Sequence, residues 1–173
     1  MTTINEKKRA PRILIVEDNP GDVLLFRRTL ERLRLDVELV VFGSAEAGLA
    51  DLRARVTMHT GELPDLILTD LNLPGMSGID LLRVVKGDPS LRRLPCVVFS
   101  SSDSVQDITN AYDAQASGYL SKSTSIEAYE QGIRALAEYW FNLMHTADAA
   151  PVMARFSPNL DLPGMTPANR LVS

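Results

Sequence analysis

The stretch RILIVEDNP, residues 12–20, joins an unbroken apolar run to a polar end. Its first half carries no polar side chain after position 12, which is typical of a strand buried on both faces of a parallel sheet. Asn19 and Pro20 then supply a helix cap and a proline for the first helical turn. The stretch therefore predicts a strand that ends in two acids, Glu17 and Asp18, and leads directly into a helix.

The same alternation recurs along the chain. Further apolar runs are expected as strands at 37–42, 66–69, 95–100 and 118–122, and the segments after them repeat apolar residues at helical spacing. Five strands alternating with amphipathic helices indicate a parallel sheet with helices on both faces. We therefore expect an α/β, flavodoxin-like, doubly wound five-stranded parallel sheet in the order 2-1-3-4-5.

The pattern divides the chain into three parts. Residues 1–10 are expected to be a flexible N-terminus, and residues 11–142 a single domain. From about 143 to 173, prolines interrupt the sequence and no strand or long helix fits. We expect this part to be a C-terminal extension without an output domain.

Composition narrows the class of protein. The chain has 22 acidic and 18 basic residues, a net charge of -4, and so lacks the basic excess that nucleic-acid binding requires. A single cysteine, Cys96, excludes an internal disulfide. The N-terminus does not match a signal peptide, and no apolar run approaches the length of a membrane span. We expect a cytoplasmic protein that binds neither nucleic acid nor membrane.

Reactive side chains end four of the predicted strands. The pair Glu17-Asp18 ends the first strand, Asp70 follows the third, Ser100 ends the fourth and Lys122 the fifth. These four strands are neighbours in the predicted order, and open parallel sheets bind ligands at the carboxyl ends of their strands. The side chains are therefore expected to converge on one edge of the sheet.

Together these residue types indicate phosphoryl transfer. Clustered carboxylates repel one another unless a cation joins them, and oxygen donors of this kind suit Mg²⁺. A lysine and a hydroxyl can hold phosphoryl oxygens, and a carboxylate can act as a nucleophile that forms an aspartyl phosphate. Each residue alone is better explained as part of a helix start, a turn, a polar loop or a surface charge. The hypothesis rests on their joint position.

Four segments, ILIVEDNPGD, LILTDLNLPGMSGIDLL, LPCVVFSSS and SGYLSKS, resemble the receiver domains of two-component response regulators. The resemblance covers about residues 12–142. It implies a signalling protein, not an enzyme with a separate substrate, that accepts a phosphoryl group from a histidine kinase. By position it implies that Asp70 is phosphorylated, that Lys122 and Ser100 assist catalytically, and that Ser100 and Tyr119 form the switch.

The same resemblance implies a metal site. Asp18 matches a direct Mg²⁺ ligand, Glu17 a ligand acting through water, and Asp70 and the backbone carbonyl of Asn72 complete the set. Ser123 departs from the family pattern, which usually has proline after the lysine. A cis bond is expensive without proline, so we expect the bond before Ser123 to be trans.

Features near the C-terminus resemble the stand-alone regulators paired with bacterial phytochromes. These are the Lys-Ser step, the EYWFNLM segment at 138–144 and the extension after it. This resemblance implies a red-light-sensing bacteriophytochrome kinase as the partner.

The apolar spacing of the last helix continues past the point where a receiver helix typically ends. Large apolar groups left in water there would form an interface, so we expect a two-fold homodimer built on this helix and the extension. Fold-back of the extension over Trp140 of its own chain is the alternative. The residues expected to project past the sheet are Trp140, Phe141, Leu143 and Met144.

Three other classes of protein fit this pattern less well. A phosphohydrolase of the haloacid dehalogenase type needs a second aspartate two residues after the nucleophile, where this chain has Asn72, which cannot transfer a proton. A flavodoxin needs a phosphate-binding loop after the first strand, where Glu17 and Asp18 would repel the phosphate. A receiver-like interaction module that takes no phosphate is the third, and nothing in the sequence favours it.

Overall fold

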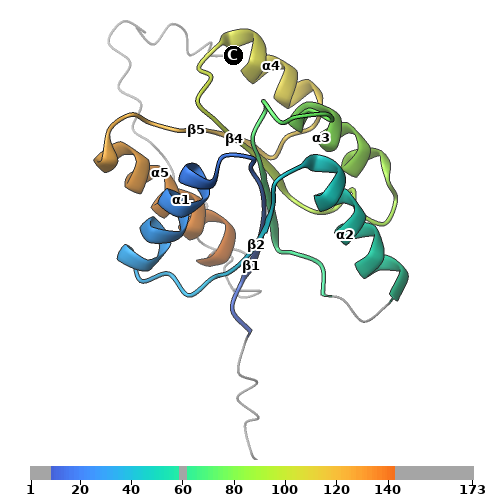
Figure 1. The fold of residues 1–173 in the computed structure, drawn as a ribbon, viewed down its shortest axis with the longest axis horizontal. Coiled ribbons are helices and arrows are strands. Elements are labelled where there is room, and N and C mark those ends of the chain that lie inside the picture. The colour runs from blue at the N-terminus through green and yellow to red at the C-terminus, as the bar shows by residue number, and fades with distance from the viewer. Residues whose placement is uncertain (1–8, 59–61, 143–173) are drawn as a thin grey trace, which may run out of the picture.

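A parallel five-stranded sheet forms the centre of the molecule (Figure 1). The computed structural model describes residues 9–58 and 62–142. The strand order is β2-β1-β3-β4-β5, which confirms the predicted 2-1-3-4-5 topology. The strands are β1 (Arg12–Val16), β2 (Glu38–Phe42), β3 (Leu66–Thr69), β4 (Cys96–Ser100) and β5 (Gly118–Ser121).

Five α-helices connect the strands and cover both faces of the sheet. In Figure 1, α1 and α5 lie on one face and α2, α3 and α4 on the other. The helices are α1 (Pro20–Arg32), α2 (Ala45–Met58), α3 (Gly78–Gly87), α4 (Val105–Asp113) and α5 (Ile126–Ala137), followed by the short π-helix η1 (Glu138–Asn142). Within the described ranges, none of the helices has the length and apolar character to cross a bilayer.

Helix starts follow from local sequence. Asn19 caps α1, as predicted, and its side chain accepts a hydrogen bond from the backbone N–H of Gly21. Serine does the same for three other helices, namely Ser77 for α3, Ser104 for α4 and Ser125 for α5. Each cap satisfies a backbone N–H that has no partner within its helix. Each of these helices follows a strand along the chain, so it begins at the carboxyl edge of the sheet, next to the strand ends.

The core has two layers, one on each face of the sheet. Side chains alternate along β1, so that Leu14 and Val16 pack under α2 and α3, while Ile13 and Ile15 pack under α1 and α5. The residues of β3 and β4 are likewise buried throughout. Burial on both faces explains why these strands are unbroken apolar runs.

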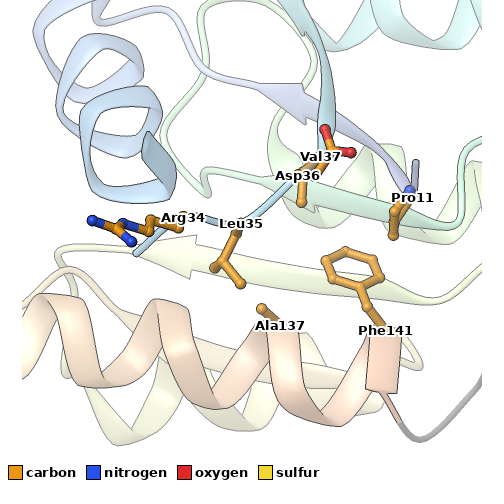
Figure 2. A pocket seen from close by; sticks show the side chains of 7 residues that line it. All are labelled: Pro11, Arg34, Leu35, Asp36, Val37, Ala137 and Phe141. Carbon is orange, nitrogen blue, oxygen red and sulfur yellow. The ribbon is translucent and has the colours of Figure 1, made fainter. Parts of the chain in front are cut away.

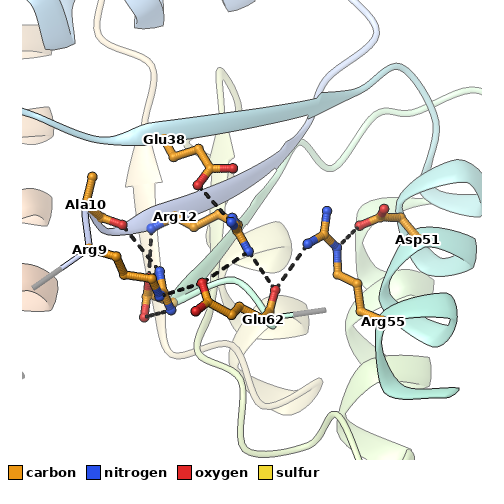
Figure 3. Close-up of polar contacts among 8 residues, drawn as sticks. Arg9, Ala10, Arg12, Glu38, Asp51, Arg55 and Glu62 are labelled. Atoms are coloured by element: carbon orange, nitrogen blue, oxygen red, sulfur yellow. Dashed lines mark hydrogen bonds and ion pairs between the residues drawn. The ribbon is translucent and has the colours of Figure 1, made fainter. Parts of the chain in front are cut away.

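A network of arginines and acids ties together the amino-terminal edge of the sheet (Figure 3). Arg12 pairs with Glu38 at 2.9 Å and donates to the backbone carbonyl of Glu62 at 2.8 Å. The same carbonyl accepts from Arg55 at 3.1 Å, and Arg9 pairs with the Glu62 carboxylate at 2.9 Å. The network joins the start of β1 to the connection before β3. It lies at the opposite edge from the strand ends that carry the reactive side chains.

The end of α5 differs from the prediction. Phe141 does not project past the sheet: it is only 8% exposed, and with Leu35 and Val37 it lines a cavity of about 240 Å³ (Figure 2). The buried residues Tyr129, Ile133, Ala137 and Phe141 follow one another at intervals of four, so the core-facing stripe continues into η1. Leu35 and Val37, in the connection between α1 and β2, pack against the same buried cluster as this ring. Phe141 is therefore removed from the predicted interface.

The other predicted interface residues have different surroundings. Trp140 is half-buried against the α1–α5 layer and contacts Tyr139, with ring centroids 4.9 Å apart. Tyr139 itself is 55% exposed. Leu143 and Met144 lie outside the described residues. Among the described residues, an exposed aromatic side chain thus remains at the end of α5.

Candidate functional site

The sheet register brings the predicted side chains to one edge. Val16 pairs with Thr69 across β1 and β3, so the next residue on each strand, Glu17 and Asp70, are neighbours. The backbone N–H of Asp70 continues the ladder by donating to the carbonyl of Val16 at 3.1 Å. On the other side, the N–H of Lys122 donates to the carbonyl of Ser100 at 2.8 Å. Four strand ends therefore meet as predicted.

Lys122 is the centre of the site. Its Nζ lies 2.5 Å from Oε2 of Glu17, 2.8 Å from Oδ2 of Asp22 and 2.9 Å from Oδ2 of Asp70. Burial by itself lowers the pKa of Lys122, but hydrogen bonds to the three carboxylates outweigh it and raise the pKa above the ordinary lysine value. The ammonium therefore stays charged, and it neutralises part of the acidic cluster.

Glu17 is the most deeply buried acid of the site, with its side chain 2% exposed. Burial raises the pKa of Glu17, and this effect exceeds the opposing hydrogen bonds from Lys122 and from the backbone N–H of Asn19. A buried carboxylate is costly without a cation beside it. Glu17 thus depends on a positive charge at this edge of the sheet.

Asp70 has the position that a nucleophile needs. Its Oδ1 accepts from the backbone N–H of Leu71 at 2.6 Å, its Oδ2 contacts Lys122, and its side chain remains 13% exposed. The helix behind it approaches very closely, since a Cβ on Gly78 would lie 1.9 Å from the carbonyl oxygen of Asp70. Only glycine permits this approach. The carboxylate is held on one side and open to solvent on the other.

The predicted metal ligands are only partly gathered. Glu17 and Asp70 lie together, but both direct an oxygen at Lys122, while Asp18 and Asn72 are exposed at the same edge. Among residues 9–58 and 62–142, no three acidic, histidine or cysteine side chains are arranged as ligands around one point. The donor chemistry, carboxylate and carbonyl oxygen, suits a hard divalent cation such as Mg²⁺. Binding one requires side chains of this set to turn.

The side chains of Ser100 and Tyr119 both form hydrogen bonds with the backbone of Ser102. Ser100 is fully buried, and its Oγ accepts from the backbone N–H of Ser102 at 3.3 Å. The hydroxyl of Tyr119 donates to the carbonyl of the same Ser102 at 2.7 Å. Burial raises the pKa of Tyr119, so the phenol keeps its proton. Both side chains of the predicted switch therefore bond to the same loop after β4.

Asp22 is a member of the site that sequence reasoning missed. It lies in the first turn of α1, 100 residues before Lys122 in the sequence. An acid in a first helical turn is normally explained by the helix dipole, and that explanation hides any further contact. The available signal was the position of α1, which begins at the carboxyl edge where ligands bind.

The bond between Lys122 and Ser123 is trans, as expected, and the described residues contain no cis peptide. The hydroxyl of Ser123 accepts from the backbone N–H of Ser125, the cap of α5. The loop after the lysine thus runs directly into the last helix without a proline.

Comparison with known proteins defines the class. The family model for the response regulator receiver domain matches residues 13–134. This chain belongs to the response regulator receiver family.

Similar proteins include a response regulator of a cyanobacterium and two phytochrome response regulators of known structure. Response regulator Rcp1 of Synechocystis sp. is 31% identical over 128 residues, 74% of this chain and 87% of Rcp1. The phosphorylated cyanobacterial phytochrome response regulator RcpA has 33% identity and a TM-score of 0.70, covering 78% of this chain and 96% of that chain. The bacteriophytochrome response regulator AtBRR has 32% identity and a TM-score of 0.63, covering 77% and 96%. The predicted resemblance to phytochrome response regulators is confirmed.

A metal-bound form is among the similar structures. The Mn²⁺-bound form of Rcp1 has 31% identity and a TM-score of 0.66, covering 75% of this chain and 94% of that chain.

Proposed function

We propose that this protein accepts a phosphoryl group from a histidine kinase onto Asp70, with Mg²⁺, in phytochrome light signalling. One observation carries the proposal: Asp70 is partly open to solvent at the carboxyl edge of the sheet while its Oδ2 lies 2.9 Å from Lys122. A carboxylate in that position can reach an incoming phosphorus atom, and the ammonium beside it offsets the charge that the reaction brings in.

The transfer itself is a displacement at phosphorus. A carboxylate oxygen of Asp70 forms a bond to phosphorus as the bond to the kinase histidine nitrogen breaks, and that nitrogen keeps the electron pair. Lys122 donates a hydrogen bond to one phosphoryl oxygen and Ser100 to another. Asp18, Asp70 and the carbonyl of Asn72 would hold Mg²⁺ directly and Glu17 through water, and the bound ion would supply charge neutralisation on the phosphoryl oxygens.

The switch follows from the loop that Ser100 and Tyr119 share. Turning the Ser100 hydroxyl toward a phosphoryl oxygen releases the backbone N–H of Ser102 that it now accepts from. Movement of Ser102 is transmitted to Tyr119, because the phenol donates to the Ser102 carbonyl. Phosphorylation thus biases two arrangements of one loop, without a change of fold.

The partners follow from the class and the relatives. RcpA is a cyanobacterial phytochrome response regulator and AtBRR a bacteriophytochrome response regulator, which supports a red-light-sensing phytochrome kinase as the phosphoryl donor. We propose a cytoplasmic location, because the protein must lie in the compartment where such a kinase takes its phosphoryl group from ATP. The net charge of -4 argues against nucleic acid as a target. We also propose a homodimer through the exposed end of α5 and the C-terminal extension, centred on Trp140 and Tyr139.

The deciding experiment is phosphorylation of the full chain. Incubation with Mg²⁺ and a small phosphodonor should add one phosphoryl group by intact mass, and removal of the metal should abolish the addition. Asp70→Asn should keep the fold and take no label. Equal labelling of Asp70→Asn and the parent would show that the acceptor lies elsewhere.

The metal site has its own test. Asp18→Ala removes an exposed ligand and relieves repulsion among carboxylates, so it should be at least as stable as the parent in metal-free buffer. Titration calorimetry should show that it no longer binds Mg²⁺. Undiminished Mg²⁺ affinity of Asp18→Ala would show that the ion binds elsewhere than at this edge of the sheet.

A further inference from the structure

All three N–H donors of the Lys122 ammonium already have an acceptor. It carries three N–H donors, and three carboxylates, from Glu17, Asp22 and Asp70, accept within 2.9 Å. The ring of Phe99 lies on a further side, with its centroid 5.5 Å from Nζ, so the ammonium is also held by a cation–π contact. A phosphoryl oxygen can therefore be bound by Lys122 only in exchange for one of its present partners.

The three partners differ in how readily they can be released. Glu17 is almost fully buried, so releasing it would leave a charge in an apolar setting. Phosphorylation removes the charge of the Asp70 carboxylate, so a phosphoryl oxygen carried by Asp70 can take its place beside the lysine. Asp22 is 35% exposed and belongs to the first turn of α1, so water can replace the ammonium there at little cost.

We infer that Asp22 is a positioning residue: it holds Lys122 in the unphosphorylated state and weakens the contact of Lys122 with the phosphoryl oxygens. This inference rests on the proposed function. Asp22 acts on the equilibrium between the unphosphorylated and the phosphorylated protein. Its carboxylate competes with the phosphoryl group for the lysine, and it also places a negative charge beside an incoming dianion. Asp22 therefore favours the unphosphorylated form and limits how fully Asp70 is phosphorylated.

The test compares two substitutions that remove one acid each. Asp22→Asn keeps the shape of the side chain and removes its charge next to Lys122. Asp80→Asn is the matched control, since Asp80 also lies in a first helical turn but bonds to Ser77 and Arg83 instead. The full chain is titrated with beryllofluoride, an analogue of the phosphoryl group, in the presence of Mg²⁺. The half-life of the phosphorylated protein is measured in parallel.

We expect Asp22→Asn to bind beryllofluoride about fivefold more tightly than the parent, the size expected for one partly exposed ion pair. Asp80→Asn should match the parent. Asp22→Glu, which keeps the charge, should return the affinity toward the parent value. A merely structural role for Asp22 would instead lower the urea midpoint of Asp22→Asn and leave its affinity for the analogue unchanged or weaker.

The outcomes separate the two proposals. If the parent binds the analogue and is labelled at Asp70, but Asp22→Asn has the same affinity as the parent, the role of Asp22 is overturned and the proposed function stands. If the parent neither binds the analogue nor takes phosphate at Asp70, the proposed function fails, and the role of Asp22 fails with it.

Discussion

Replacing Lys122 by methionine should destabilise the protein in a way that depends on pH. The substitution keeps a long unbranched side chain but removes the cation from three carboxylates. Glu17 dominates the effect, because it is nearly inaccessible to water and loses its ion-pair partner. The side chains of Asp22 and Asp70 are 35% and 13% exposed, so water screens them better than Glu17 when the cation is lost.

The magnitude follows from the burial of Glu17. Removing one partner of a buried ion pair costs about 3–5 kcal/mol, and protonation of the stranded acid limits the loss, so we expect about 3 kcal/mol at pH 7.5. For a chain of this length that corresponds to a fall in Tm of about 9 °C.

The sign of the pH dependence comes from the pKa of Glu17. Burial already raises this pKa above the unfolded value of 4.5, and loss of the Lys122 hydrogen bond raises it further. A group whose folded-state pKa is raised contributes full stability below its unfolded pKa and loses it as pH rises through the folded value. The difference between Lys122→Met and the parent should therefore shrink as the pH falls from 7.5 toward 5.

Urea unfolding in metal-free buffer, followed by circular dichroism at several pH values, measures this difference. Lys86→Met is the control, because Lys86 donates to the backbone carbonyls of Arg92 and Leu94 and pairs with no buried acid. Adding Glu17→Gln to Lys122→Met should recover most of the stability at pH 7.5. A loss of equal size at every pH, or no recovery in the double variant, would refute the assignment of the effect to Glu17.

Three further predictions concern other parts of the chain. Gly78→Ala should lose about 3 kcal/mol in thermal unfolding, because its Cβ would overlap the carbonyl of Asp70, whereas Gly87→Ala, where a Cβ meets nothing, should not be destabilised. Burial raises the pKa of Cys96 from 9.0 to about 11, so its thiol should resist alkylation at pH 8 until urea unfolds the protein, and stability should fall as the pH rises from about 9 toward 11. Truncation after Asn142 keeps the buried part of η1 but removes the C-terminal extension from the proposed interface, so it should weaken the dimer, measured by light scattering over a range of concentrations, and the truncated chain should still take phosphate; an unchanged dimer would place the interface outside the extension.

The sequence by itself determined the sheet and the edge at which the reactive side chains meet. Apolar runs such as 13–16 and 66–69 are long enough to require burial on both faces, and helices between them force a parallel sheet. Once a strand is placed, the residue that follows it must lie at the carboxyl edge. Asp70 and Lys122 could therefore be assigned to one site although they are 52 residues apart.

Only the tertiary structure decided where individual side chains point. That Lys122 binds three acids, one of them Asp22 on a helix, depends on how close the first turn of α1 lies to the end of β5, and no local pattern records that distance. Phe141 is buried for the same kind of reason, because Leu35 and Val37, in the connection between α1 and β2, pack against the same buried cluster. Periodicity specifies which face of a helix is apolar, but the neighbour that covers this face, and how far it extends, is set by packing between segments remote in sequence.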